Sequence, residues 1–339
     1  MKPNDFAYYL TGFLTKYLPN ETGASVNTIS SYRDTFTLLL EFMRDKKHVA
    51  VEKITLVKIK KEIIEEFLDW IEIERNCSTS TRNVRLAALH SFFKYLQYEN
   101  PDYLLEWQRI LSIPIKKCEK GIMTYMTVDG IKLLLEMPDV STRDGRRDLA
   151  LISLMYDTGA RVQEIVDLIP SCIRFEHPCT IKLTGKGNKA RIVPLMEKET
   201  HILKRYMEEE RLLTPAAGQY PLFFNRRKEK LTRAGIGYIL DKYVKMARNM
   251  NNALVPEKFT CHCLRHSKAM HLLQAGVNLV YIRDILGHSS VQTTEIYARA
   301  DSKQKREAIE RAYTDVTPIE LPIWQTNNNL LEWLKNFNR

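Results

Sequence analysis

The sequence predicts a mainly α-helical protein with one small antiparallel β-sheet, divided into two domains. Apolar residues recur every three or four positions over most of the chain, a spacing typical of amphipathic helices. Only the segment 180–195 combines two β-rich runs with a glycine-rich link. A chain of 339 residues exceeds the roughly 250–300 residues at which a single hydrophobic core stops growing, so we expect two cores.

The first 112 residues are predicted to form a helical bundle. Their apolar stripes predict four or five helices, over 5–18, 29–43, 58–75, 79–99 and, as a short fifth helix, 104–111. Asp5 is the expected cap of the first helix. Residues 113–122 are the predicted linker, because they combine Pro114 with the basic residues Lys116, Lys117 and Lys120.

The second domain is predicted over residues 123–313. Thr127 is a candidate helix cap, and further helices are expected over 148–156, 198–212, 232–249 and 303–313. Gly159 is expected to end a helix with a positive φ, so that Arg161 begins the next one.

The predicted sheet lies in the middle of this domain. The runs 180–184 and 191–195 form a hairpin with its tip at 185–189, and 172–175 is a candidate third strand. The tail, 314–339, ends in an apolar stripe of Leu330, Trp333, Leu334 and Phe337. A helix of that length is too short to stand alone in water, so we expect it to dock on another surface.

Composition favours a polyanionic partner and an intracellular location. Lys plus Arg total 51 and Asp plus Glu total 41, a net charge of +10. The first residues lack a signal peptide, and no run of about 18 apolar residues predicts a membrane span. The six cysteines are scattered, which favours reduced cytosolic thiols. Cys261 and Cys263 flank a histidine, but no second cysteine pair completes a zinc site, so we expect no metal.

The segment 260–299 concentrates side chains suited to phosphate chemistry. His262 and Arg265 are three positions apart and share one face of a helix. His288 follows the helix-breaking Gly287, and Tyr297 comes nine residues later. An arginine fork matches phosphate oxygens and keeps its charge, and a phenol becomes a covalent nucleophile once its proton is removed. Each residue alone also fits ordinary packing or surface roles.

Together these residues resemble the C-terminal signature of the tyrosine recombinases, the phage integrase and Xer-like family. The signature reads His262-x-x-Arg265-His266, then Leu286-Gly287-His288, then Tyr297. The same family carries two upstream boxes, an arginine after a Thr-Gly turn and a lysine at a hairpin tip. The chain has both in order, in Thr158-Gly159-Ala160-Arg161 and in Thr184-Gly185-Lys186-Gly187. Cys261 replaces a frequent proline, Asp157 replaces a frequent alanine, and the tail is longer than in compact members.

The resemblance implies a mechanism. Arg161 and Arg265 hold the non-bridging oxygens of the scissile phosphate, and His262 and His288 donate hydrogen bonds or move protons. Tyr297 forms a 3′-phosphotyrosyl link, after which a 5′ hydroxyl from the partner duplex reverses the reaction. Lys186 protonates the leaving 5′ oxygen. The link retains the bond energy, so neither ATP nor a metal cofactor is required.

The resemblance also implies how the domains meet DNA. Residues 1–112 correspond to a SAM-like core-binding domain, which would close with the catalytic domain as a C-shaped clamp on double-stranded DNA carrying a specific recombination site. Candidate DNA contacts are Arg82, Lys116, Lys117, Arg226 and Arg227. The hydroxyls at 78–81 fit helix capping as well as phosphate binding, and a basic run such as 226–230 is also typical of a solvated surface.

A site-specific DNA recombinase is therefore the expected function, as the integrase or transposase of a mobile element. We expect a monomer or weak oligomer free in solution and a homotetramer on DNA, with the tail docking on a neighbouring protomer or on its own domain. The expected location is the bacterial cytoplasm, on the nucleoid when bound. A catalytically silent architectural protein and a type IB topoisomerase-like relaxing enzyme are the alternatives.

Overall fold

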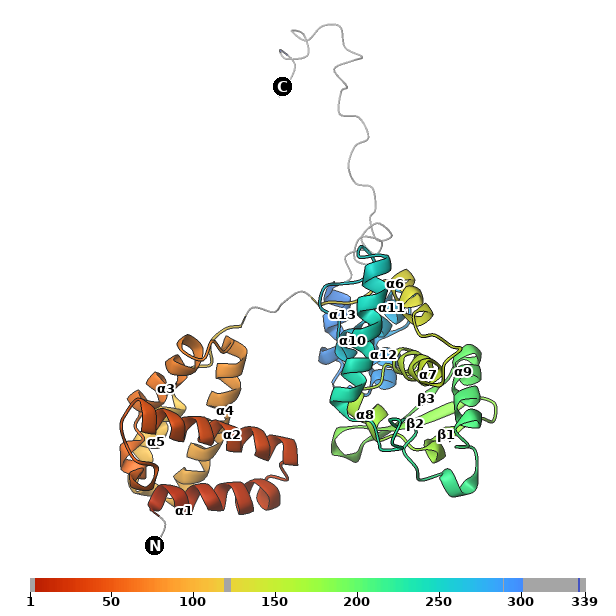
Figure 1. Cartoon of the computed structure of the whole chain (residues 1–339). Coiled ribbons are helices and arrows are strands. Elements are labelled where there is room, and N and C mark those ends of the chain that lie inside the picture. The colour runs from red at the N-terminus through yellow and green to blue at the C-terminus, as the bar shows by residue number, and fades with distance from the viewer. Residues whose placement is uncertain (1–3, 119–122, 289, 301–334, 336–339) are drawn as a thin grey trace. The chain divides into compact units, whose positions relative to one another are not determined.

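The computed structural model describes residues 4–118, 123–288, 290–300 and 335, in two compact units, Met1–Gly121 and Ile122–Arg339 (Figure 1). The predicted helix over 303–313, the end of the predicted linker and the apolar stripe of the tail lie outside the described residues. No helix in the described ranges is long and apolar enough to cross a membrane.

The first unit is a bundle in which the five predicted helices are confirmed. They are α1 (Asp5–Gly12), α2 (Val26–Asp45), α3 (Lys61–Ile73), α4 (Thr79–Glu99) and α5 (Leu104–Leu111). A π-helical segment, Phe13–Glu21, continues α1. Within this unit α4 has the most buried residues; it packs against α2, α3 and α5 and contributes Phe92 to an aromatic core with Phe13 and Phe36.

The predicted cap of the first helix was wrong by one residue. The Asn4 side chain accepts a hydrogen bond from the backbone N–H of Ala7 and caps α1. Asp5 instead reaches across the bundle, where its carboxylate accepts a hydrogen bond from the backbone N–H of Leu56 at 3.2 Å. Asn and Asp are both favoured cap residues because each carries an acceptor oxygen, so local sequence does not separate the two roles.

The second unit is built around α7 (Arg143–Thr158), which packs against α6 (Val128–Glu136), α9 (Glu197–Glu209) and α11 (Cys261–Gln274). The remaining helices are α8 (Val162–Val166), α10 (Arg233–Met250), α12 (Leu279–Leu286) and α13 (Gln292–Ala300). Thr127 caps α6 as predicted. The start predicted for α7 was wrong by five residues, because Thr142 caps the helix ahead of its arginine-rich first turns.

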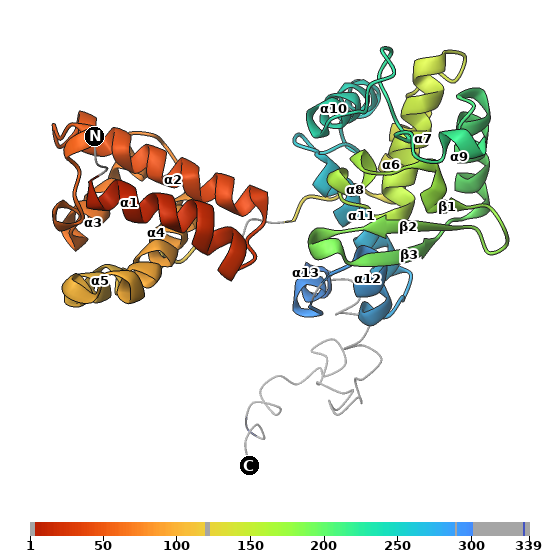
Figure 2. The ribbon, with the colours of Figure 1, turned by 90° about the horizontal axis from the view of Figure 1, so that it is seen from below.

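The predicted three-stranded antiparallel sheet is confirmed. It has the order β1 (Ile173–Arg174), β2 (Thr180–Thr184) and β3 (Ala190–Pro194). The register pairs Ile181 with Val193 and Leu183 with Arg191. On one side of the sheet β3 contacts α12, and the two lie side by side in Figure 2. The sheet therefore carries the hairpin tip and Arg191 to the same region as the end of α12.

Candidate functional site

Arg161 stands at the first turn of α8, directly after the bend at Gly159. Gly159 has φ +57, the left-handed conformation expected from the sequence. The backbone N–H of Arg161 donates to Glu164 Oε2 at 2.8 Å, and its guanidinium Nη1 donates to Oε1 at 3.0 Å. Its Nη2 donates to the carbonyl of Gly287 at 3.1 Å. Glu164 therefore fixes the direction of the Arg161 side chain, which is still 40 % exposed.

Glu164 is also held by Arg191 of β3, a residue to which sequence reasoning assigned no role. Arg191 Nη1 and Nη2 donate to the two Glu164 oxygens at 2.8 and 2.7 Å, and its Nε donates to the carbonyl of Ile285 at 2.7 Å. Burial by itself raises the pKa of Glu164, but the hydrogen bonds and charges of Arg191 and Arg161 outweigh burial and lower it. The carboxylate thus stays ionised between two arginines.

Three arginines converge on the C-terminal end of α12. Arg191 binds the carbonyl of Ile285, Arg265 binds that of Leu286 at 2.6 Å, and Arg161 binds that of Gly287. The last carbonyls of a helix have no partner inside the helix and carry its negative dipole end, which suits guanidinium groups.

Arg265 links this helix end to the turn at Gly159. Its second amino group, Nη1, donates to the Gly159 carbonyl at 2.7 Å, and the residue is only 2 % exposed. The two arginines of the predicted site, Arg161 and Arg265, are therefore brought together although they are far apart in sequence. His288 follows Gly287 directly and lies at the same place.

Tyr297 of α13 lies among three histidines. Its Oη is 3.0 Å from Nδ1 of His266, and its ring is nearly parallel to that of His288, with centroids 6.3 Å apart. The ring of His262 packs edge-on against His266 at 4.2 Å. Nδ1 of His288 is hydrogen-bonded to Thr294 Oγ1 at 2.9 Å. Tyr297 itself is 1 % exposed.

Burial and nearby guanidinium groups keep these imidazoles neutral. Burial, with the charges of neighbouring groups on α11, lowers the pKa of His266 to about 4. Burial and the three arginines lower the pKa of His288 to about 4, and burial lowers that of His262 as well. Burial raises the pKa of Tyr297, while Arg265 and Arg161 oppose the rise. The positive charge of the site therefore resides on its arginines.

The hairpin tip reaches the same site through its backbone. Residues Lys186–Asn188 form a short 3-10 turn between β2 and β3. Immediately before it, a Cβ added at Gly185 would lie 3.0 Å from Glu164 Oε1 and 3.6 Å from Arg161 Nη1. The chain entering the tip thus passes in contact with the first arginine box. The side chain of Lys186 is outside the described part of the structure.

The DNA-contact candidates of the first unit have structural partners. Arg82 is 4 % exposed, and its Nη1 donates to the carbonyl of Pro114 at 3.0 Å. Lys116 is paired with Glu72. For Lys117, no ion pair is found within the described residues. Arg82 therefore anchors the start of the predicted linker to α4, and its contact with DNA stays a prediction.

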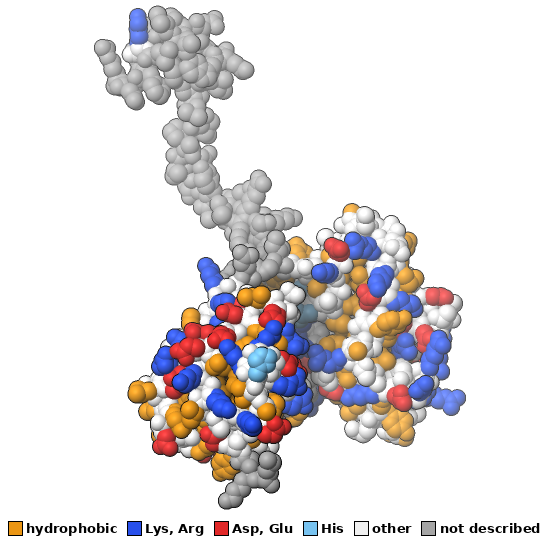
Figure 3. Space-filling model, turned by 60° about the vertical axis from the view of Figure 1, so that its left-hand side comes forward, with side chains coloured by type: hydrophobic (Ala, Val, Ile, Leu, Met, Phe, Trp, Pro, Cys, Tyr) orange, Lys and Arg blue, Asp and Glu red, His pale blue; other side chains and the backbone are white. Residues whose placement is uncertain are grey.

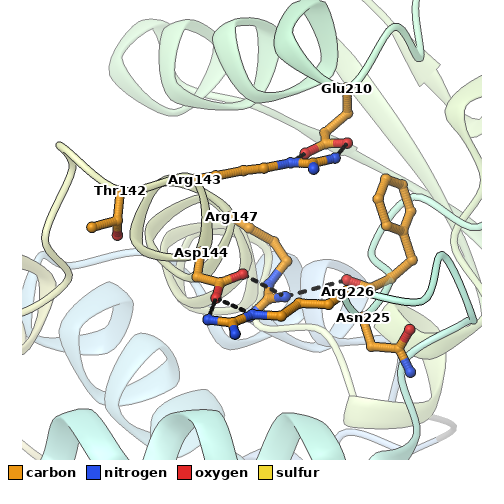
Figure 4. Close-up of a pocket in the computed structure, with 8 residues that line it drawn as sticks. Thr142, Arg143, Asp144, Arg147, Glu210, Asn225 and Arg226 are labelled. Carbon is orange, nitrogen blue, oxygen red and sulfur yellow. Dashed lines mark hydrogen bonds and ion pairs between the residues drawn. The ribbon is translucent and has the colours of Figure 1, made fainter.

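One of the two candidates of the second unit, Arg226, lies at a pocket of about 430 Å³ (Figure 4). Arg226 lines this pocket and is paired with Asp144 at 2.6 Å, while Arg143 on the opposite wall is paired with Glu210. In the described chain no ion pair is found for Arg227. On the face shown in Figure 3, basic and acidic side chains are likewise interspersed.

Comparison with known proteins gives consistent similarities. Residues 124–304 match the phage integrase family, and residues 11–100 match the SAM-like N-terminal domain of phage integrases. A putative integrase/recombinase of Sinorhizobium fredii is 35 % identical over 336 residues, 99 % of each chain. Tyrosine recombinase XerC of Thermodesulfovibrio yellowstonii is 30 % identical, covering 90 % of this chain and 96 % of its own.

Among solved structures, the XerH site-specific recombinase bound to palindromic difH substrate in a post-cleavage complex is similar. Its TM-score is 0.67 with 25 % identity, covering 88 % of this chain and 83 % of XerH.

Proposed function

The chain belongs to the phage integrase family and is a tyrosine site-specific recombinase, and we propose that Tyr297 is the nucleophile with which it cuts and rejoins DNA. The observation that carries this proposal is the convergence of Arg161 and Arg265 on the end of α12, beside a tyrosine surrounded by histidines. Among the described residues no other part of the chain combines these groups.

Arg161 and Arg265 bind the scissile phosphate in this proposal. Their described hydrogen bonds use two of the five N–H groups of each guanidinium, which leaves the others for non-bridging oxygens. Donors held by a buried carboxylate and by helix carbonyls need little reorganisation when charge develops on phosphorus. His262 and His288, as neutral imidazoles, each have one N–H to donate to the same oxygens.

The strand exchange proceeds by two transesterifications. Tyr297 Oη attacks phosphorus and forms a 3′-phosphotyrosyl bond, while Lys186 donates a proton to the departing 5′ oxygen. A 5′ hydroxyl from the partner duplex then attacks the link and releases the tyrosine. Tyr297 is 1 % exposed, so its phenol has to become accessible to the phosphate before it can attack phosphorus.

We further propose the assembly expected from the family. Residues 1–112 and 123–313 grip double-stranded DNA as a clamp joined by the linker 113–122, and four protomers assemble on two sites. The tail, 314–339, docks on a neighbouring protomer. The chain acts in the bacterial cytoplasm on nucleoid DNA, as the integrase of a mobile element, in line with the putative integrase it resembles.

A covalent-adduct assay tests the nucleophile. DNA sites are first recovered by selecting bound fragments from a random library, and a duplex nicked next to the scissile position then traps the cleaved strand. Wild type is expected to form an adduct that survives denaturing gel electrophoresis, and Tyr297→Phe to form none. Tyr281→Phe is the matched control, because Tyr281 is an exposed tyrosine on α12. An adduct formed by Tyr297→Phe would refute the assignment.

The product separates the remaining alternatives. Joining of strands from two different duplexes is expected for a recombinase, whereas relaxation of one supercoiled duplex without joining to a second duplex would indicate a relaxing enzyme. Binding without an adduct in the wild type would indicate an architectural protein.

A further inference from the structure

His266 is the side chain that contacts the atom proposed to attack phosphorus. Its Nδ1 lies 3.0 Å from Oη of Tyr297, and the two rings meet at 62° with centroids 5.6 Å apart. His266 follows Arg265 on α11, so one helix supplies both a phosphate-binding arginine and the partner of the phenol. A heavy-atom distance of about 2.6–3.2 Å is what direct proton transfer requires.

The other two histidines of the site are arranged differently. Nδ1 of His288 is occupied by Thr294, and the His288 ring lies parallel to Tyr297 rather than pointing a nitrogen at it. His262 packs against His266. Within the described residues, the hydrogen bond to the Tyr297 hydroxyl is made by His266.

Resting on the function proposed above, we propose that His266 is a catalytic residue that accepts the phenol proton of Tyr297 during attack. The Oη–phosphorus bond forms as the proton moves to Nδ1, and the bond between phosphorus and the 5′ oxygen breaks as Lys186 supplies a proton there. In rejoining, a 5′ hydroxyl attacks phosphorus and passes its proton to Lys186. The departing Tyr297 oxygen recovers its proton from the imidazolium of His266.

The protonation state of His266 suits this role. The titratable and charged groups that face it are His262 and Arg265 on its own helix, His288 in the loop after α12, and Tyr297 on α13. Burial, followed by His262 and Arg265, lowers its pKa to about 4, so the imidazole is neutral and able to accept a proton at pH 7. A DNA phosphate bound to Arg265 brings negative charge into the site, which raises the pKa of His266 and strengthens it as a base.

Two substitutions separate basicity from hydrogen bonding. His266→Asn places an amide oxygen near the position of Nδ1 and keeps an acceptor for the phenol, but removes the basic nitrogen. His266→Ala removes both. The substrate is a suicide duplex with a sulfur in place of the bridging 5′ oxygen, because a thiolate leaves without protonation and the role of Lys186 drops out. Cleavage is followed in a single turnover from pH 6 to pH 9.

We expect His266→Asn to slow cleavage by about 10²–10⁴-fold at pH 7, the usual contribution of a general base. Its rate should rise about tenfold per pH unit, because hydroxide must then remove the phenol proton, while the wild-type rate stays nearly flat. His271→Asn is the matched control, since His271 lies on the same helix and its Nδ1 pairs with another tyrosine hydroxyl, that of Tyr156, at 2.9 Å. This control should keep the wild-type rate and pH profile.

A wild-type rate and flat profile in His266→Asn would overturn the proposal, because an acceptor without basicity would then suffice. If both His266 variants fail to fold or to bind DNA, the pH dependence of the wild-type cleavage rate decides the question. A wild-type rate that climbs tenfold per pH unit over the same range would show that solvent removes the proton. Failure of the underlying function looks different, since the Tyr297→Phe chain would then still form an adduct.

Discussion

Replacing Arg191 with methionine should destabilise the second, catalytic unit more than the same replacement of an exposed arginine would. The substitution keeps the apolar stem of the side chain but removes two bonds to Glu164 and one to the Ile285 carbonyl. The Glu164 side chain is 3 % exposed and would keep only Arg161 as its cationic partner. A buried carboxylate that loses such a partner is left poorly compensated in a medium of low polarity.

The expected cost is about 3–5 kcal/mol, the usual effect of breaking a buried ion pair by removing one partner. Arg205→Met is the matched control, because Arg205 is paired with Glu209 but is 70 % exposed. Exposed pairs contribute roughly 0–1 kcal/mol. Adding Glu164→Gln to Arg191→Met should recover about 1 kcal/mol or more, since the uncompensated charge is then gone.

The pH dependence follows from the direction of the Glu164 pKa. The folded pKa lies below the ordinary value of 4.5, so the stability from this pair is present above that value and is lost as pH falls through the folded pKa. The cost of Arg191→Met should therefore be full at pH 7 and shrink below pH 4.5.

Hydrogen exchange in rising urea, read by mass spectrometry, measures this cost. Peptides from α7, α11 and α12 report the catalytic unit, and peptides from α2 and α4 of the other unit serve as an internal reference. Equal protection losses in Arg191→Met and Arg205→Met would refute the reasoning. So would a loss confined to the first unit.

Two other sites give testable predictions. Glu199 is buried, one of its oxygens has no hydrogen-bond partner in the described chain, and burial, with Asp157 adding, raises its pKa to about 8 from 4.5. The contribution of Glu199 to the free energy of unfolding should therefore be fully present below pH 4.5 and fall by on the order of 3–5 kcal/mol as the pH rises to 8. Urea unfolding at pH 5, 6.5 and 8 measures this fall, which should be much smaller in Glu199→Gln. In Gly287→Ala, the new Cβ would lie 2.9 Å from Arg191 Nη1, on a backbone with φ +64, so adduct formation should fall at least tenfold. Gly276→Ala is the control, because that glycine has φ +82 but open space around it, and this variant should form the adduct at the wild-type level.

Local patterns in the sequence were sufficient to predict most elements of the fold. The helix over 79–99, the cap at Thr127 and the turn at Gly159 depend on residues within one or two helical turns. Errors occurred where two neighbouring residues could serve the same local role, as at Asn4 and Asp5. The start of α7 was missed because its arginine-rich first turns have the polar composition of a loop, although Thr142 caps the helix just before them.

The candidate site was only partly predictable. Family resemblance identified Arg161, Arg265, His288 and Tyr297, which the structure brings together. It assigned no role to Arg191 or His266, although His266 stood inside the recognised signature and Arg191 began the second strand of the predicted hairpin. The alternation of side chains along β3 could have predicted an ion pair for Arg191. Arg191 shares a strand face with the buried Val193, and a charge on a buried face requires a partner.

By itself, then, the sequence determined the helices, the hairpin, the order of the motifs and the family to which they belong. Tertiary structure alone decided that three guanidinium groups meet at the last carbonyls of α12, and that the Tyr297 hydroxyl meets His266. The physical reason is range. Periodicity and capping act within a few residues, whereas Arg161 and Gly287 are 126 positions apart and Arg265 and Gly159 are 106 apart. Such contacts exist only once α11, α12 and β3 have packed against one another.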